Sequence, residues 1–381
     1  MFYTVFSTND TPYMQWQSDL LEYSWKKVEQ EGVLVRLVAT NTPDSLPPQK
    51  YAHCVSARLW DVHPETGDFY PIYNKPASLL EWLFRDRPEG TVLLLDPDCV
   101  FRKPVTRRVA PGYPASQKWI GLTTEHPNKD RPFGFGEGFS FLNDHCAKVD
   151  LGTEAIMIPT LIHTSDLRKV CARWLQLCGI IRQNYRDSEG SQAWESDMFA
   201  YVAACAEYGL HHDPASLGIC TNWQPDDCPD APIIHYCQPI LAKDGEEIFF
   251  KQTYKPWERI DASKEAEQDY GHDLVATINA FVDESTGATG KQTPDSRPKW
   301  RDTVIEGRVI DELLLEVPSE HRSVWLNGAG KAIWELCDGS HTIDEIEAKL
   351  AERFSVADRD VAADVSATVG QLHSAGFLEI R

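Results

Sequence analysis

The chain has 381 residues, 42% of them hydrophobic, and a formal net charge of −21 from 37 basic and 58 acidic side chains. Its length favours two domains over one, and its charge argues against nucleic acid or an anionic membrane as a partner, because phosphates would repel it. We expect a cytoplasmic protein, since the amino terminus becomes polar too soon for a signal peptide and no run of 18 apolar residues occurs.

The cysteines give no sign of a metal site. There are 10 of them, without a C-x-x-C pair. The spacing of Cys220, Cys228 and Cys237 matches no common zinc site. Scattered reduced thiols are the favoured interpretation.

The first forty residues predict the start of a parallel α/β layer. Short apolar runs predict strands at Tyr3–Phe6 and Val33–Ala39, and Asp10 or Thr11 can cap the helix between them, with Pro12 in its first turn. A strand–helix–strand unit places the loop after its first strand at the ligand edge of the sheet. Small hydroxyls and a carboxylate in that loop could hold a nucleoside: Ser7, Thr8 and Asp10.

The segment His63–Pro76 is dense in turn formers and aromatic residues. Asn74 can cap a helix over Ala77–Phe84, which would place Lys75 at the positive end of that helix. A lysine in this position suits a diphosphate, and a solvated lysine at a helix end is the alternative.

The stretch Thr91–Phe101 carries the strongest chemical signal. Four apolar residues lead into Asp96 and Asp98, with a proline between them, so a buried strand should end at about Leu95. The two carboxylates then stand at the carboxyl end of a central strand, where α/β sheets bind ligands. Their oxygens suit Mg²⁺ or Mn²⁺ carrying a diphosphate, although an ordinary surface turn is equally compatible with this stretch alone.

Residues 102–150 are rich in proline, glycine and aromatic residues. The glycines are not followed by the helix of a dinucleotide fingerprint. Such a long irregular stretch is typical of a binding loop or lid, so we expect acceptor contacts here. A strand over Glu154–Pro159 and a helix over His163–Tyr185 are predicted next.

A helix predicted over Trp194–Tyr208 carries a carboxylate between two aromatic residues. Trp194, Asp197 and Tyr201 recur at spacings of three and four and so share one face. This face could meet a sugar ring, with the aromatic residues stacking on it and the acid facing developing positive charge. A structural, hydrogen-bonded aspartate is the alternative.

A short strand over Pro232–Tyr236 contains His235, which becomes a candidate ligand only if it lies near Asp98. A helix over Lys264–Phe281 and a segment of linker composition, residues 284–298, follow. We therefore expect one domain over 1–262, a helix and linker over 263–300, and a second domain over 301–381.

Residues 301–381 predict a winged-helix-like α+β outline, in which two or three short strands precede three helices. Asn327 caps the first helix, Thr342 and Glu345 form a capping box for the second, and apolar residues from Val361 to Leu372 line the third. With 8 basic against 16 acidic residues the segment has a net charge of −8. This charge disfavours DNA but not a peptide.

The first domain resembles the plant and algal peptidyl serine α-galactosyltransferases and hydroxyproline O-arabinosyltransferases, which have a GT-A fold. The motifs that carry the resemblance are Phe6-Ser7-Thr8 with Pro12-Tyr13; His63-Pro64 through Asn74-Lys75-Pro76; Leu95-Asp96-x-Asp98; Asp166-Leu167-Arg168; Trp194-x-Ser196-Asp197-Met198; and His235-Tyr236. Phe69 and Asp197 stand where that family usually has Trp and Glu.

This resemblance implies a metal-dependent glycosyltransferase that uses a nucleotide-sugar, expected to be a UDP-sugar. Asp98 and His235 would ligate Mn²⁺ or Mg²⁺, and Asp96 would contact the ribose or the metal. Lys75 and Asn74 would approach the diphosphate. We expect Asp197 to be the catalytic residue that stabilises oxocarbenium-like charge, and Trp194 to contact the nucleotide-sugar.

The tail resembles PqqD, a small protein that binds the leader of precursor peptides. The motifs are Leu326-Asn327-x-x-Gly330, Ile333-Trp334-x-Leu336-Cys337-Asp338-Gly339, Ile343-x-x-Ile346 and Asp364-Val365 through Gly376-Phe377-Leu378. The resemblance implies that a leader adds as a strand beside the small sheet and packs on the third helix. The expected contact residues are Leu313, Leu315, Val324, Val365 and Val369.

Together these features predict a glycosyltransferase that modifies a side chain, expected to be a hydroxyl, of a ribosomally made precursor peptide. The alternative is a non-catalytic leader-binding chaperone or scaffold with a degenerate transferase domain. The presence of Asp96, Asp98, Lys75 and His235 weighs against that alternative.

Overall fold

The computed structural model describes residues 1–43, 46, 49–118, 141–142, 145, 156–185, 194–221, 230–288, 296–309, 312–317, 322–354, 358–374 and 376–380. Two compact units emerge: Met1–Pro43, Tyr51–Tyr254 and Ala262–Leu274 form the first, and Asp44–Lys50, Lys255–Asp261 and Val275–Arg381 form the second. Most of the glycine-rich stretch expected to contact the acceptor lies outside the described residues. No described helix combines the length and apolar composition of a membrane span.

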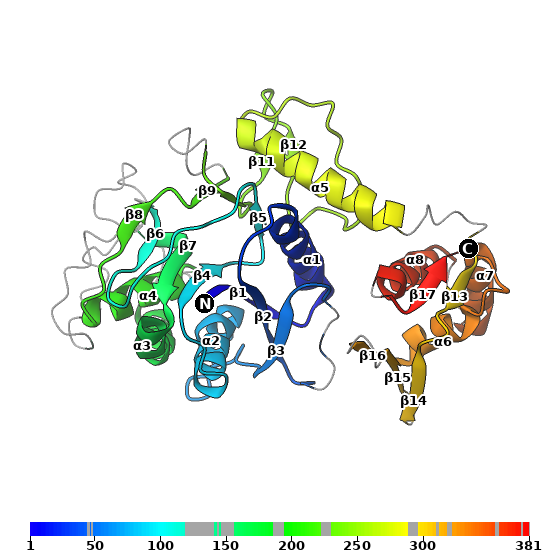
Figure 1. The fold of residues 1–381 in the computed structure, drawn as a ribbon, viewed down its shortest axis with the longest axis horizontal. Helices are drawn as coiled ribbons and strands as arrows, with labels where there is room; N and C mark the ends of the chain where they lie inside the picture. Colours follow the sequence, from blue (N-terminus) through cyan, green and yellow to red (C-terminus); the bar gives the residue numbers. More distant parts are fainter. Residues whose placement is uncertain are drawn as a thin grey trace. The chain divides into compact units, whose positions relative to one another are not determined.

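A seven-stranded mixed sheet organises the first unit, in the order β3-β2-β1-β4-β7-β6-β8 (Figure 1). Its first four strands are parallel, whereas β7 is antiparallel to both of its neighbours. The expected α/β class is thus confirmed. The bounds are β1 (Phe2–Asn9), β2 (Val33–Thr40), β3 (His53–Arg58), β4 (Thr91–Leu95), β6 (Ala115–Lys118), β7 (Ile156–His163) and β8 (Asp213–Ala215).

Strand β1 is longer than its sequence predicts. The expected loop at Ser7–Asp10 is wrong for its first three residues, because Ser7, Thr8 and Asn9 continue the pairing with β2. Sheet pairing here outweighs the low strand preference of short polar residues. Asp10 is the first of these residues beyond the strand.

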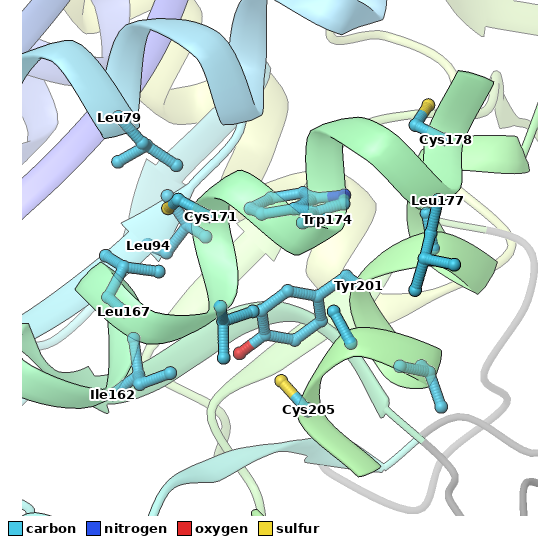
Figure 2. Packing of buried hydrophobic residues seen from close by; sticks show 14 of the residues in the cluster. Leu79, Leu94, Ile162, Leu167, Cys171, Trp174, Leu177, Cys178, Tyr201 and Cys205 are labelled. Carbon is cyan, nitrogen blue, oxygen red and sulfur yellow. The ribbon is translucent and has the colours of Figure 1, made fainter. Parts of the chain in front are cut away.

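Helices cover both faces of this sheet. Helix α1 (Pro12–Lys27) packs on one face, and Thr11 caps it as predicted, accepting a hydrogen bond from the backbone N of Met14 at 3.3 Å. On the other face lie α2 (Asn74–Arg85), α3 (Thr164–Asn184) and α4 (Ser196–Glu207). Figure 2 shows their shared core, in which side chains from these helices meet those of β4 and β7: Leu79, Leu94, Ile162, Leu167, Trp174 and Tyr201.

The starts of three helices differ from those that local sequence signals predict. Asn74 does not cap α2, because it lies inside the first turn and its side chain is hydrogen-bonded elsewhere. Helix α4 begins only at Ser196, so Trp194 does not share a helical face with Asp197. The helix expected over Lys264–Phe281 is α5 (Asp269–Ala288), which starts and ends later.

A second, three-stranded sheet lies beside the end of β4. It contains β5 (Cys99–Phe101), β10 (Ile233–His235) and β9 (Gly218–Cys220), with β10 in the middle. Antiparallel pairing aligns His235 with Cys99, the residue after Asp98. The remaining short elements of this unit are η1 (Pro71–Tyr73), β11 (Ile240–Leu241) and β12 (Glu247–Phe249).

The carboxyl-terminal elements confirm the predicted strands and helices. The sheet β14-β15-β16 precedes three helices, and a separate antiparallel pair joins β13 to β17. The sequence did not predict this pair. The bounds are β13 (Pro298–Trp300), β14 (Ile305–Val309), β15 (Glu312–Val317), β16 (Arg322–Leu326), α6 (Gly328–Leu336), α7 (Ile343–Phe354), α8 (Asp358–Ser374) and β17 (Leu378–Ile380).

The predicted capping box at α7 supplies a stability test. The backbone N of Thr342 donates to Glu345 Oε2 at 2.8 Å, and the backbone N of Glu345 donates to Thr342 Oγ1 at 3.2 Å. Thr342→Ala should therefore lower the free energy of unfolding of this segment by about 1 kcal/mol. Chemical denaturation can measure the change, and Thr342→Ser should restore most of it. An alanine variant as stable as wild type would contradict a contribution from this cap.

Candidate active site

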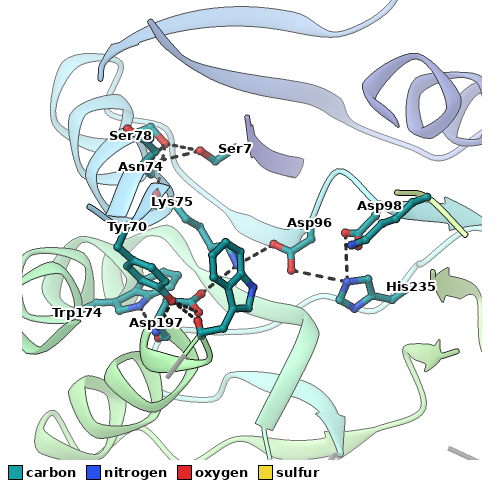
Figure 3. A network of polar contacts seen from close by, with 12 residues as sticks. Ser7, Tyr70, Asn74, Lys75, Ser78, Asp96, Asp98, Trp174, Asp197 and His235 are labelled. Carbon is teal, nitrogen blue, oxygen red and sulfur yellow. Dashed lines mark hydrogen bonds and ion pairs between the residues drawn. The ribbon is translucent and has the colours of Figure 1, made fainter. Parts of the chain in front are cut away.

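The two carboxylates after β4 lie at the carboxyl ends of the parallel strands. Strand β4 ends at Leu95, as predicted, and Asp98 is only 5% exposed. His235, at the end of β10, places its Nε2 3.2 Å from Asp98 Oδ1 and 3.8 Å from Asp96 Oδ2 (Figure 3). His235 was a candidate ligand only if it lies near Asp98. It does, because the antiparallel pairing of β10 with β5 brings it to the aspartates.

Lys251 is a further member of this cluster, and the sequence did not reveal it. Its Nζ forms an ion pair with Asp98 Oδ2, the oxygen that His235 leaves free. Burial alone would raise the pKa of Asp98, but the charges of His235 and Lys251 lower it well below its usual value. Burial likewise works against the His235 imidazolium, yet Asp98 raises its pKa to about 9. Asp98 is therefore held ionised between two cationic partners.

Lys75 links this cluster to Asp197. From the first turn of α2, its Nζ lies 2.8 Å from Asp96 Oδ1 and 3.1 Å from Asp197 Oδ2. Burial would lower its pKa, but the two carboxylates raise it above the ordinary value. The alternative of a solvated lysine is wrong, since only 15% of the side chain is exposed.

Asp197 is held on its other side by aromatic residues. Tyr70 Oη lies 3.3 Å from Asp197 Oδ1 and also donates to the backbone O of Trp194. Trp174 Nε1 donates to the backbone O of Asp197 at 2.7 Å. Burial raises the pKa of the Asp197 carboxyl, and Lys75 opposes this effect. The site thus presents a buried acid with one charged and one aromatic neighbour.

A buried ion pair supports Tyr70 from behind. Arg182 donates from Nε and Nη2 to the two carboxylate oxygens of Asp68, both at 2.9 Å, and its guanidinium lies 4.3 Å from the centroid of the Tyr70 ring. Tyr73 Oη donates to the same carboxylate at 2.9 Å. The motif from His63 to Pro76 therefore supplies Lys75 and also the scaffold that orients Tyr70.

Ser7, Thr8 and Asp10, the residues predicted to hold the nucleoside, differ from one another in contacts and exposure. Ser7 Oγ lies 2.9 Å from Ser78 Oγ, and Thr8 Oγ1 accepts from Arg36 Nε at 3.0 Å. Thr8 is 2% exposed, whereas Asp10 lies outside the strand and is exposed. Asp10 is therefore the nucleoside candidate with a side chain open to solvent.

Asn74 and Trp194 differ most from expectation. Asn74 is 2% exposed, accepts from the backbone N of Trp60 at 2.6 Å and donates to the backbone O of Pro71 at 2.9 Å. These bonds use the side-chain amide of Asn74 to support the start of α2. Few of its hydrogen-bonding atoms therefore remain for a diphosphate. Trp194 is 63% exposed, ahead of α4.

The donor set beside β4 fits a hard divalent cation. One donor atom each from Asp96, Asp98 and His235 lies within 4.8 Å of the others. The two carboxylates suit Mn²⁺ or Mg²⁺, and His235 adds one nitrogen donor. Two cysteines also lie beside His235. The Sγ atoms of Cys220 and Cys237 are 2.6 Å apart, so these two thiols are not scattered as the sequence predicted. Cys228 lies outside the described residues.

The residues expected to contact a leader are mostly core residues of the tail. Leu313, Leu315, Val365 and Val369 are at most 1% exposed, and Val324 is partly buried against the same cluster. A docked peptide would therefore reach backbone groups of the outer strands, β14 and β16, sooner than these side chains.

Comparisons with known proteins agree with both resemblances. Residues 2–214 match the model of the hydroxyproline O-arabinosyltransferase family N-terminal domain, and residues 313–378 match that of coenzyme PQQ synthesis protein D, PqqD. A peptidyl serine alpha-galactosyltransferase of Arabidopsis thaliana is 28% identical over 62% of this chain and 30% of its own length. Hydroxyproline O-arabinosyltransferase 3 of the same plant is 24% identical over 55% of this chain and 57% of its own.

The chain thus spans between about a third and just over half of the length of these curated relatives. Among solved structures, galactosyltransferase LgtC with donor and acceptor sugar analogues covers 73% of this chain and 95% of its own, at 11% identity and a TM-score of 0.39. TbiB1 in complex with the TbiA(beta) leader peptide covers 21% of this chain and 94% of its own, at 25% identity and a TM-score of 0.20.

Proposed function

Because this chain belongs to the hydroxyproline O-arabinosyltransferase family, whose N-terminal domain it matches over residues 2–214, we propose that it transfers a sugar from a UDP-sugar to a hydroxyl side chain of a precursor peptide. The observation that carries the proposal is the meeting of Asp98, Asp96 and His235 at the end of β4, next to Lys75 and Asp197. A solvated surface turn would not bring these five side chains together.

Asp98, His235 and Asp96 would hold the divalent metal. When bound, the metal would act as a Lewis acid and template that neutralises charge on the leaving diphosphate. Lys75 and Lys251 place two further positive charges beside the same carboxylates. Both are suited to a diphosphate that approaches the cluster, and Asp10 stands near the end of the adjacent strand β1 for the nucleoside.

Asp197 would face the anomeric carbon and stabilise positive charge that develops there in the transition state. Lys75 and Tyr70 fix its two oxygens from opposite sides. A fixed, buried carboxylate needs little reorganisation during the reaction, which is the condition under which electrostatic stabilisation is most effective.

The PqqD domain supplies the peptide to this site in our proposal. A leader would pair as an extra strand with an outer strand of the sheet β14-β15-β16, so that backbone hydrogen bonds provide the affinity. Because both activities reside in one chain, leader binding would raise the effective concentration of the core peptide at Asp197.

The proposal can be tested by mixing the full chain with a precursor peptide encoded next to its gene, Mn²⁺ and candidate UDP-sugars. We expect UDP release and a peptide mass increased by one hexose or pentose, both lost when EDTA is added. Leader binding without UDP release from any donor would favour the scaffold alternative. Transfer that persists in EDTA would reject the metal assignment.

A further inference from the structure

Two free thiols lie in contact beside His235. Cys220 is the last residue of β9, and Cys237 follows the end of β10 by two residues. Their Sγ atoms are 2.6 Å apart, and a disulfide needs a separation of about 2.05 Å. One donor atom each of Cys220, Cys237 and His235 lies within 4.8 Å of the others. The two thiols are therefore close enough to form a disulfide and to influence the histidine.

We propose that Cys220 and Cys237 form a reversible disulfide that holds His235 in position for the divalent metal. The formation of the bond is independent of the proposed function, whereas its effect on the metal rests on the metal site assigned there. The metal affinity of the site would then depend on the redox state of the two cysteines.

The backbone holds the two cysteines beside each other. Parallel pairing of β9 with β10 aligns Cys220 with His235, and the backbone N of Thr221 donates to the backbone O of His235 at 3.1 Å. Thr221 Oγ1 donates to the backbone O of Gln238 at 2.8 Å and accepts from its backbone N at 2.9 Å. Both chain segments are thus already ordered next to Cys220 and Cys237, so closing the bond costs little further conformational entropy.

The imidazole of His235 lacks a support that metal-ligating histidines usually have. Its Nε2 lies 3.2 Å from Asp98 Oδ1, while its Nδ1 is buried and has no hydrogen-bond partner among the described residues. In most metal sites the second ring nitrogen donates to a carboxylate, carbonyl or water, which fixes the orientation of the ring. The orientation of His235 must therefore come from its strand and from the side chains beside it, which include the two thiols. A disulfide would join these thiols into one rigid support.

Cys237 is the entry point for an oxidant, because it is partly exposed and Cys220 is 0% exposed. With a low-molecular-weight disulfide as the oxidant, the Cys237 sulfur attacks one sulfur of its S–S bond. This step forms a mixed disulfide on Cys237 and releases one thiol, which carries the proton that Cys237 loses. The Cys220 sulfur then attacks the Cys237 sulfur, forms the Cys220–Cys237 bond and releases the second thiol with the proton of Cys220. The chain loses two hydrogens with their electrons, and the small disulfide gains them.

Peptide mapping tests whether the bond forms. The full chain is incubated with oxidised or reduced glutathione, and the remaining thiols are alkylated under denaturing conditions before digestion. We expect oxidised glutathione to give one linked pair of peptides that contains Cys220 and Cys237 and disappears on reduction. Alkylation of both cysteines after oxidation, or linkage of either one to Cys228 or another cysteine, would overturn the proposal.

Calorimetry with Mn²⁺ tests the effect on His235. Reduction of the disulfide should weaken Mn²⁺ binding by wild type about tenfold, the lower end of the loss caused by removing the support of a ligating histidine. Cys220→Ser should bind Mn²⁺ like reduced wild type, whichever glutathione it has met. Cys54→Ser is the matched control, because Cys54 is also a partly buried free thiol but lies on β3, and this variant should behave like wild type. Equal Mn²⁺ affinities of oxidised and reduced wild type would overturn the role in positioning His235.

Thermal melts without metal separate this inference from the proposed function. If neither form binds Mn²⁺, the metal assignment fails, but the linked peptides and the melting temperature can still be measured. The bond would close a loop between residues 17 positions apart, so reduction should lower the melting temperature of wild type by about 5 °C. Cys220→Ser should show no such shift. A melting temperature of wild type that does not change on reduction would overturn the proposal that the bond holds this part of the chain.

Discussion

Asp98→Asn should slow sugar transfer by about three orders of magnitude and leave leader binding unchanged. Asparagine keeps the size of the side chain but removes the charge that His235 and Lys251 contact from two directions. The proposed metal would then lose its most buried anionic ligand. Since a metal supplies several kcal/mol of transition-state stabilisation, we expect the rate to fall by about three orders of magnitude.

Mass spectrometry of the peptide product would measure the rate, and fluorescence anisotropy of a labelled leader would measure binding. Asp213→Asn is a suitable control. The side chain of Asp213 is 65% exposed and forms an ion pair with Arg107 at the surface. Mn²⁺ affinity, measured by calorimetry, should weaken in Asp98→Asn alone. A variant that keeps more than a tenth of the wild-type rate would reject Asp98 as a metal ligand.

Most features of the fold and of the site that the sequence could predict have a local signal. The apolar run that ends before Asp96 and Asp98 is confirmed as β4, with the two carboxylates beyond its end. Thr11, Asn327 and the Thr342 capping box are confirmed because a cap depends on a few adjacent residues. His235 was predicted as a ligand only on the condition that it lies near Asp98. That condition depends on pairing between strands that are distant in the sequence.

Other parts of the site depend on tertiary contacts that no local sequence pattern indicates. Lys251 lies in a polar turn that resembles many others, and it becomes part of the site only because it reaches Asp98. Arg182 looks like an ordinary helical arginine until it meets Asp68, 114 positions away in the chain. Trp194 was placed on a helical face by its spacing, but α4 begins two residues later. In each case tertiary packing decides the role of the side chain.

Asp197→Asn tests the catalytic role most directly. The variant keeps the shape of the side chain and its possible contacts with Lys75 and Tyr70, but it cannot present a negative charge to the anomeric carbon. Loss of one preorganised electrostatic group typically lowers kcat by about 10²- to 10³-fold. The KM for the donor and the affinity for Mn²⁺ should change little, because Asp197 lies outside the group formed by Asp96, Asp98 and His235.

Steady-state kinetics with a saturating precursor would give kcat, and Asp197→Glu provides the matched comparison. The family usually has glutamate at this position, so the longer acid should keep activity within about tenfold of wild type, equivalent to about 1.4 kcal/mol of barrier. Asparagine that turns over as fast as aspartate would instead identify Asp197 as a structural residue. Its carboxylate would then serve only to hold Lys75 beside Asp96, and catalysis would have to rest on the metal and the two lysines.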